Sequence, residues 1–362
     1  MAASLLALPI ASQGVAYSYT DLNPSGFQAS FGIGASGSQQ VGYGYGFGTG
    51  GQDHAFLWSG TASSVVDLNP TGFTLSLAFG TSGSQQVGYG YGSGSGGQYH
   101  ALLWSGTASS KVDLNPTGIQ SSQAFGASGS QQVGFGYGPS TLGINHALLW
   151  FGTASSVVDL NPSGFTTSQA YNTSGSQQVG YGGLGSVTHA LLWSGTASSA
   201  VDLNPAGFTS SFAVAVSGSH QVGYGSGSAS GNQNHALLWS GTASSVVDLN
   251  PSGFTISIAD GVFGGQQVGR GSGSATGNHT HALLWSGTAG SVVDLGSLLS
   301  SDYSDSFAET IDENGNIIGQ ATYIPTGQAH AILWTVVPEP GTVTLLALGS
   351  VALMMRKRFE RG

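Results

Sequence analysis

Histidine is the residue with metal-binding or catalytic chemistry that recurs most regularly in this chain of 362 residues. The string His-Ala-Leu-Leu-Trp, or a close variant, occurs seven times at intervals of 43 to 49 residues. An imidazole can ligate a metal ion or act as a general base. Each histidine holds the same place in its own copy, however, so the seven should lie on separate units instead of gathering around one ion. We therefore predict a structural role for the histidines and tryptophans of these strings, which are His54, Trp58, His100, Trp104, His146, Trp150, His189, Trp193, His235, Trp239, His281, Trp285, His330 and Trp334.

Aspartate recurs with the same period, mostly in the string Asp-Leu-Asn-Pro, as at Asp67. We expect each aspartate to accept backbone N–H groups of its own turn. A hydrogen bond from the repeated histidine to a turn or to this aspartate is the structural role that we favour.

Two less regular features have metal-binding chemistry. His279 and His281 are two residues apart, so on a strand both side chains point the same way. The segment from Asp312 to Asn316, Asp-Glu-Asn-Gly-Asn, resembles the start of a calcium loop but lacks the terminal glutamate at the right distance. Both signals are weak, and for the second we favour a solvated turn. We predict no metal site and no cofactor.

Tyrosines alternate with glycines in several Gly-Tyr-Gly-Tyr-Gly strings, as at Tyr43, Tyr45, Tyr89 and Tyr91. On a strand this places the aromatic rings on one face. Such rows can stack on sugar rings or pack against a neighbouring sheet, and we favour packing. The chain has no Gly-x-Ser-x-Gly elbow, phosphate-binding loop or zinc-protease string. We therefore predict that it is not an enzyme and has no catalytic residue.

The amino-acid composition excludes nucleic-acid-binding proteins and proteins with disulfides or thiolate metal sites. Only 6% of the residues are charged, the formal net charge is −10, and 61 residues are glycine. Nucleic-acid binding is excluded because it requires clustered lysine and arginine. The chain has no cysteine, which excludes disulfides and thiolate metal sites.

The repeats must build the elements that position these residues. The second copy contains four short β-type runs, Val-Val-Asp-Leu, Phe-Thr-Leu-Ser-Leu-Ala-Phe-Gly, Gln-Gln-Val-Gly-Tyr-Gly-Tyr-Gly and His-Ala-Leu-Leu-Trp, separated by turn residues. Both faces of the last run are apolar, so it should lie between two sheets. Four-stranded units of about 46 residues are typical of propeller blades. We predict an all-β fold, a seven-bladed β-propeller, with a β-solenoid as the alternative.

The ends of the repeat region favour closure of a ring. The first copy has no His-Ala-Leu-Leu-Trp string before its Asp-Leu, and the last copy has no Asp-Leu after its string. A strand from one end can therefore complete the blade at the other end and leave no open edge.

The copies resemble the HAF-repeat family of extracellular bacterial proteins. The resemblance rests on His-Ala-Phe-Leu-Trp at His54–Trp58, on Asp294-Leu295-Gly296 and on the segment from Ile311 to Ala321, and it covers nearly all of residues 15–334. Asp-Leu-Asn-Pro and Gly-Ser-Gln-Gln in the earlier copies depart from that pattern. The resemblance implies export and a repeated β scaffold, and it implies no reaction.

The two termini differ from the repeats. Residues 1–14 contain a short apolar run followed by small residues, as in the later part of a secretory signal peptide. Residues 341–355 contain no charge and are short for a transmembrane helix. Basic residues that follow an apolar helix hold that end on the cytoplasmic side, and here they are Arg356, Lys357, Arg358 and Arg361.

The C-terminal segment resembles the PEP-CTERM sorting signal. The resemblance rests on Val337-Pro338-Glu339-Pro340, the apolar run and the basic terminus, in this order at the end of the chain. It implies that a membrane-embedded exosortase recognises the segment and cleaves near Pro-Glu-Pro, in a Gram-negative bacterium that produces exopolysaccharide.

These features predict three parts: a signal peptide at 1–14, a propeller of HAF-like repeats at 15–335, and a sorting signal at 336–362 with a transmembrane helix at 341–355. We expect an exported, exosortase-sorted surface or extracellular-matrix protein with a non-catalytic scaffold, associated with exopolysaccharide or biofilm. Its partners would be an exosortase, the membrane and exopolysaccharide. A carbohydrate-binding module, an extracellular polymer-degrading enzyme and, more weakly, an ice-binding protein are the alternatives.

Overall fold

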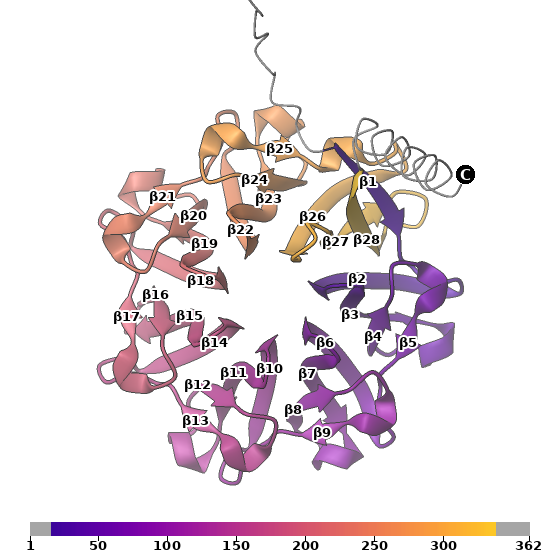
Figure 1. The fold of residues 1–362 in the computed structure, drawn as a ribbon, viewed down its shortest axis with the longest axis vertical. Coiled ribbons are helices and arrows are strands. Elements are labelled where there is room, and N and C mark those ends of the chain that lie inside the picture. Colours follow the sequence, from indigo (N-terminus) through magenta and orange to yellow (C-terminus); the bar gives the residue numbers. More distant parts are fainter. Residues whose placement is uncertain (1–15, 338–362) are drawn as a thin grey trace, which may run out of the picture.

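The computed structural model describes residues 16–337, which form 28 β-strands in seven four-stranded antiparallel sheets. The sheets are arranged as blades around a central axis (Figure 1). The prediction of an all-β, seven-bladed propeller is confirmed, and the alternative of a β-solenoid is wrong. The predicted signal peptide at 1–14 and the predicted helix at 341–355 lie outside the described residues. Within residues 16–337, no helix is long and apolar enough to cross a membrane.

In the first six blades an inner strand, a second strand, a third strand and a short outer strand follow one another along the chain. The first three blades are β2 (Phe27–Ser36), β3 (Gln39–Gly46), β4 (His54–Trp58) and β5 (Val66–Asp67); β6 (Phe73–Ser82), β7 (Gln85–Gly92), β8 (Tyr99–Trp104) and β9 (Val112–Asp113); and β10 (Ser121–Ser128), β11 (Gln131–Tyr137), β12 (His146–Trp150) and β13 (Val158–Asp159). The next three are β14 (Thr167–Ser174), β15 (Gln177–Leu184), β16 (Val187–Trp193) and β17 (Val201–Asp202); β18 (Ser210–Ser217), β19 (His220–Ser226), β20 (His235–Trp239) and β21 (Val247–Asp248); and β22 (Ile256–Phe263), β23 (Gln266–Ser272), β24 (His281–Trp285) and β25 (Val293–Asp294).

The seventh blade combines both ends of the described chain. It consists of β26 (Tyr303–Ile311), β27 (Ile317–Tyr323), β28 (Gln328–Val337) and β1 (Ala16–Asp21). Short 3₁₀ turns connect the strands: η1 (Phe47–Thr49), η2 (Ala62–Ser64), η3 (Ser93–Ser95), η4 (Ala108–Ser110), η5 (Pro139–Thr141), η6 (Ala154–Ser156), η7 (Ala197–Ser199), η8 (Ser228–Ser230), η9 (Ala243–Ser245), η10 (Ser274–Thr276), η11 (Ala289–Ser291) and η12 (Gly296–Leu298).

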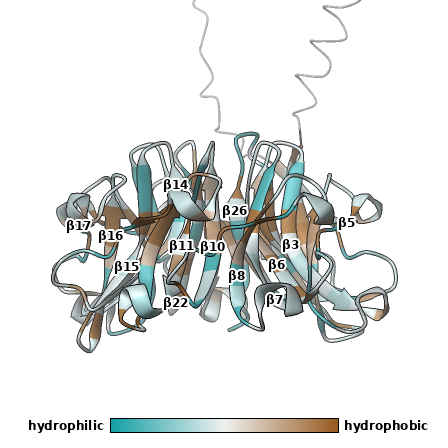
Figure 2. Cartoon of the chain, turned by 90° about the horizontal axis from the view of Figure 1, so that it is seen from below, coloured by the Kyte–Doolittle hydropathy of each residue, from teal (hydrophilic) through white to brown (hydrophobic). Residues whose placement is uncertain are grey.

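The third strand of each blade is buried on both faces. In β8, Leu102 and Trp104 pack with Ala55 and Leu57 of the preceding blade. The opposite face of β8 packs against the following blade, where Ala101 and Leu103 contact Leu148 and Trp150. The apolar residues accordingly form a band at mid-height of the blades, between more polar ends (Figure 2). This is the arrangement that the two apolar faces of His-Ala-Leu-Leu-Trp predict.

The ring is closed by pairing between the two ends of the described chain. Strand β1 pairs antiparallel with β28, from Ala16 opposite Val337 to Asp21 opposite Ile332, and the two strands lie side by side in Figure 1. The N-terminal segment therefore supplies the outer strand that the seventh blade would otherwise lack.

The propeller has two distinct faces. We call the side of the hairpins between inner and second strands the turn face, and the side of the Asp-Leu-Asn-Pro segments the loop face. Strand β28 ends at the turn face, because Trp334 pairs with Ile317 at the start of β27. Ala16 pairs with Val337, so both ends of the described chain lie at the turn face.

The position after each Gln-Val requires glycine for a steric reason. In the second blade, the pairing of β6 with β7 shifts between Ala78 and Gly80, which marks a bulge in the inner strand. The bulge brings the carbonyl oxygen of Leu77 over Gly88, where a Cβ atom would collide with it. The equivalent glycines of the other six blades, including Gly319 after Ile-Ile in the seventh, each meet the corresponding carbonyl oxygen of their own inner strand, so a side chain at this position would collide with the backbone.

We expect the substitution Gly88→Ala to destabilise the protein by about 1–3 kcal/mol, because the added methyl group must displace backbone. Gly290→Ala is the matched control, since a Cβ there meets nothing within 4 Å, and its effect should stay within about 0.5 kcal/mol. Urea unfolding followed by circular dichroism measures both. Equal stability of the two variants would contradict this account of the bulge.

Candidate functional site

The repeated histidines lie beside the repeated aspartates. In each of the seven blades the histidine Nδ1 is 2.7 or 2.8 Å from an aspartate Oδ2 on the neighbouring outer strand. In six blades the partner is 13 residues further along the chain, as for His54 and Asp67. In the seventh blade, His330 pairs with Asp21 across the ring closure.

These pairs belong to a network that joins neighbouring blades. The N–H of Asn115 donates to Asp113 Oδ1 at 2.8 Å. Ser122, on the next inner strand, accepts from the N–H of Ala101 at 3.1 Å and donates to Asn115 Oδ1 at 2.6 Å. Comparable bonds recur around the ring, so these polar groups hold blades together and do not meet at one point. Within residues 16–337 no three His, Asp or Glu side chains are grouped in a way that would hold a metal ion.

The two less regular candidates, the His279 and His281 pair and the segment from Asp312 to Asn316, do not have the arrangement of a metal site. His281 pairs with Asp294 at 2.8 Å, whereas His279 lies 3.8 Å from Asp305. The turn that starts at Asp312 is not fully solvated as expected, because Asp312 is only 2% exposed. Its carboxylate accepts the N–H groups of Asn314 and Asn316 and thereby holds the hairpin together.

The tyrosine rows pack between strands. Tyr89 stacks on Phe79 with ring centroids 5.4 Å apart and meets Tyr99 edge-on at 5.6 Å. Burial raises the pKa of Tyr89 to about 12. Tyr91 is more exposed and lies 5.3 Å from the Tyr99 ring. Tyr89 therefore packs against aromatic neighbours with its side chain partly buried.

The central channel contains the least repetitive chemistry of the described chain. Seven equivalent residues, one from each inner strand, line a cavity of about 240 Å³. We call them the channel ring: Ile33, Phe79, Phe125, Tyr171, Val214, Asp260 and Glu309. Five blades contribute apolar or aromatic side chains, and the sixth and seventh blades contribute carboxylates.

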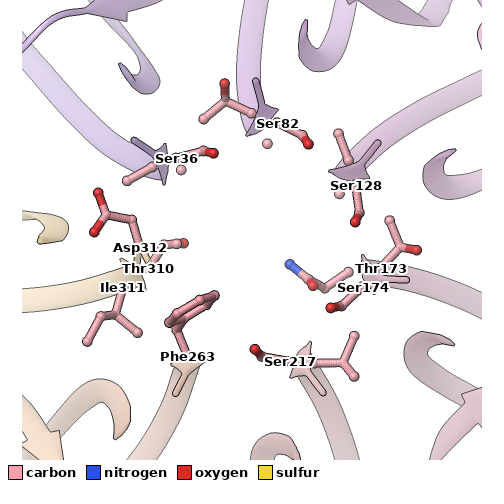
Figure 3. Close-up of a pocket in the computed structure, with 18 of the residues that line it drawn as sticks. Ser36, Ser82, Ser128, Thr173, Ser174, Ser217, Phe263, Thr310, Ile311 and Asp312 are labelled. Carbon is pink, nitrogen blue, oxygen red and sulfur yellow. The ribbon is translucent and has the colours of Figure 1, made fainter. Parts of the chain in front are cut away.

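The mouth of the channel at the turn face is mostly polar. Ser36, Ser82, Ser128, Ser174 and Ser217 surround it, together with Phe263 and Asp312 (Figure 3). Each mouth residue follows a channel-ring residue by three positions along the chain, so the ring lies about 10 Å deeper. The channel thus leads from a hydroxyl-lined entrance to a cavity with one aromatic and one acidic side.

One guanidinium lies between the two carboxylates of the ring. Arg270 Nη1 is 2.9 Å from Asp260 Oδ2 and 3.8 Å from Glu309 Oε1. Gln320 Nε2 donates to the same Glu309 oxygen at 3.1 Å. Burial raises the pKa of Asp260 to about 8, against the opposing effect of Arg270, and it also raises the pKa of Glu309. A single guanidinium neutralises one carboxylate, so the second carboxylate favours a proton or another cation.

Sequence reasoning missed Asp260, Arg270 and Glu309. The signal was present as departures from the repeat. Arg270 stands where other copies have tyrosine or phenylalanine after Gln-Val-Gly, and Asp260 stands where the second, third and fourth copies have an aromatic residue. The search for known motifs could not find them, because the three residues share no local pattern.

A second cavity opens on the loop face where the ring closes. It has a volume of about 520 Å³ and is lined by three aromatic and three amide side chains, among other residues: Phe27, Tyr45, Tyr323, Asn23, Gln28 and Gln328. The Tyr45 hydroxyl donates to Gln328 Oε1 at 2.7 Å, and the Tyr323 ring stacks on His330 at 4.6 Å. We call this cavity the junction pocket.

Comparison with known proteins identifies the C-terminal segment. Residues 336–358 match the model of the PEP-CTERM protein-sorting motif, as the sequence predicts. Only Val336 and Val337 of this segment are among the described residues. A search of curated proteins finds no relative by sequence.

Solved structures with a similar fold have little sequence in common with the chain. The β-propeller domain of the Trilobed protease from Pyrococcus furiosus has 8% identity and a TM-score of 0.55, over 85% of this chain and 94% of that one. An oligogalacturonate lyase from Vibrio parahaemolyticus has 9% identity and a TM-score of 0.53, over 90% and 98%. A puromycin hydrolase mutant complexed with PGG has 12% identity and a TM-score of 0.56, over 83% of this chain and 53% of its own. The chain thus spans about half the length of that hydrolase, and these similarities concern the fold alone.

The Asp21 carboxylate lies where the two ends of the described chain pair to close the ring. The carboxylate accepts from His330, the Asn23 N–H and the Tyr303 hydroxyl, each at 2.7 Å. Burial alone would raise the pKa of Asp21, but these three hydrogen bonds outweigh it and hold the pKa below its usual value. We expect Asp21→Asn to cost about 1.5–3 kcal/mol of unfolding free energy at pH 7, as for hydrogen bonds to a charged group.

The matched control is Asp67→Asn, which removes the same charge from a blade made of consecutive strands and has no tyrosine partner. Asp67→Asn should lower the free energy of unfolding by less than Asp21→Asn does. The lowered pKa means that the contribution of Asp21 is present above the pKa of the unfolded chain and disappears as pH falls through the folded pKa. Urea unfolding at pH 7 and at pH 3 tests both points; an Asp21→Asn effect that is unchanged at pH 3 would contradict the assignment.

Proposed function

We propose that this chain is exported, processed by an exosortase and displayed at the cell surface as a non-catalytic propeller scaffold that associates with exopolysaccharide. The match of residues 336–358 to the PEP-CTERM motif carries the proposal. That motif is the signal that exosortases process. The resemblance to HAF repeats, which remains a prediction, also favours an extracellular location.

The placement of the sorting segment supports a defined orientation. The segment continues from Val337 at the turn face, so sorting through it would direct the loop face away from the membrane. The described body contains fourteen carboxylate residues and two basic residues, a formal charge of −12. The four basic residues near the C-terminus, Arg356, Lys357, Arg358 and Arg361, are the features expected to keep that end at the cytoplasmic side.

A non-catalytic role is supported by the distribution of polar chemistry. The histidines and aspartates are engaged in equivalent contacts in all seven blades. Groups that are this widely separated cannot act together on one substrate. The channel trio of Asp260, Arg270 and Glu309 is the exception, and its most direct role is binding, since its charges already pair with one another.

Processing can be tested by intact mass spectrometry and cell fractionation of the native protein. We expect a mature form that ends near Pro338–Pro340 and lacks the basic tail. Replacement of Pro338, Glu339 and Pro340 by alanine should leave the tail attached and the protein in the membrane fraction. Thr326→Ala, a matched substitution on the loop face, should process normally. A mature wild-type protein that retains residues 356–362 in the membrane would contradict the proposal.

The junction pocket favours carbohydrate binding as a second candidate function. Three aromatic rings and three amides line it, and this combination suits a neutral sugar, which stacks on rings and exchanges hydrogen bonds with amides. Asn23 Oδ1 is buried and has no hydrogen-bond partner among the described residues. The pocket opens on the loop face, away from the sorting segment, where a surface polymer would be accessible.

A glycan array with the full chain tests this candidate. We expect Tyr323→Ala to weaken binding about threefold to tenfold, in line with the energy of an aromatic contact. Tyr91→Ala is the control, because Tyr91 is exposed and does not line the pocket. Absence of glycan binding, or equal losses in both variants, would contradict it. The appearance of new reducing ends during incubation would instead favour a polymer-degrading enzyme.

A further inference from the structure

The channel ring is asymmetric in charge and aromaticity. Phe79, Phe125 and Tyr171, from the second, third and fourth blades, form one side. Asp260 and Glu309, from the sixth and seventh blades, lie in the same cavity. A second cavity of about 250 Å³ adjoins the first and shares Tyr171, Val214 and Asp260 with it. The interior of the channel thus combines aromatic rings with carboxylates around partly open cavities.

The charges inside the channel do not balance. Asp260 and Glu309 together provide two carboxylates, and Arg270 provides one guanidinium. Residues 16–337 contain one other lysine or arginine, Lys111, which lies 5.2 Å from the Phe73 ring. A buried carboxylate without a counterion is unfavourable. One guanidinium neutralises one of the two carboxylates, so the other is neutralised by a proton or by an added cation.

The aromatic side can stabilise a cation that is not a metal. The rings of Phe79 and Phe125 are 5.0 Å apart with an interplanar angle of 72°, so they form two walls at a steep angle. Tyr171 continues the wall at 5.2 Å from Phe125. Aromatic rings attract organic cations, above all quaternary ammonium groups. The rings of Phe79 and Phe125 offer no oxygen ligand to calcium or magnesium, so this side of the cavity favours an organic cation over either metal ion.

We propose that the central channel binds a small organic cation of the alkylammonium class, with the ammonium group held between Glu309 and Asp260 on one side and Phe79, Phe125 and Tyr171 on the other. The cavities are smaller than the pockets that hold drug-sized ligands, so the ligand is a small molecule or the head group of a larger one. It enters from the turn face between the serine hydroxyls of the mouth (Figure 3).

This site is independent of the proposed sorting and of the junction pocket. Its residues line the central channel, whereas the sorting segment follows the last strand of the seventh blade and the junction pocket opens on the loop face. Failure of one proposal leaves the others unaffected.

Isothermal titration calorimetry of the full chain with choline tests the site, and 3,3-dimethyl-1-butanol, the neutral analogue of the same shape, is the ligand control. We expect choline to bind and the neutral analogue to bind at least about tenfold more weakly, since only the cation interacts with the charge of the carboxylates. Glu309→Gln should weaken choline binding about tenfold, because it retains the oxygen that accepts from Gln320 and removes the excess charge.

Phe125→Leu should weaken choline binding about threefold to tenfold through loss of the cation–π contact. Asp302→Asn removes an exposed carboxylate outside the channel, and it should change binding by less than about twofold because exposed charges are screened. Thermal melting followed by circular dichroism verifies that each variant is folded. Absence of choline binding to the wild-type protein, equal binding of the neutral analogue, or unchanged binding in folded Glu309→Gln would each overturn the proposal.

Discussion

The packing of each third strand between two neighbouring blades is the interaction on which the rest of the structure depends. A five-residue strand with two apolar faces, such as His54–Trp58, cannot be stable at a surface, so every blade requires a neighbour on both sides. Seven tryptophans with no exposed surface, one per third strand, extend this contact around the ring. A linear array would leave two such faces open, and closure by β1 and β28 removes both.

Positions that are the same in every copy and positions that differ between copies have different roles in this molecule. The positions that recur, such as the histidine–aspartate pairs, the buried tryptophans and the glycine below each bulge, build the ring. Among the positions that vary, some face the channel or lie at the closure, and others are on the outer surface, such as Leu142 and Phe151. In the sixth and seventh blades, Asp260 and Glu309 replace apolar residues of the channel ring, and Arg270 replaces an aromatic residue on the second strand. The apolar packing of the third strands between blades does not involve these side chains, although Arg270 also contacts Glu309 and Phe307 of the next blade.

Much of the fold follows from the sequence. The two-sided apolar pattern of the third strands and the missing strings at the two ends predict a closed ring of sandwiched sheets, and the sorting motif is readable from its order of residues. The channel site was not predicted, because Asp260 and Glu309 are 49 positions apart in the sequence and only the registry of blades around the axis brings them together. The junction pocket was missed for a related reason, since it joins residues near position 25 with residues near 325.

Hydrogen exchange of the full chain, followed by mass spectrometry, tests the closed ring most directly. The account predicts that the backbone amides of β1 (Ala16–Asp21) that donate to β28 exchange as slowly as the paired amides of β28, whereas the alternate amides of this edge strand exchange faster. Rapid exchange throughout β1, with β28 still protected on its β27 side, would mean that the ring is open at this blade and would contradict the account.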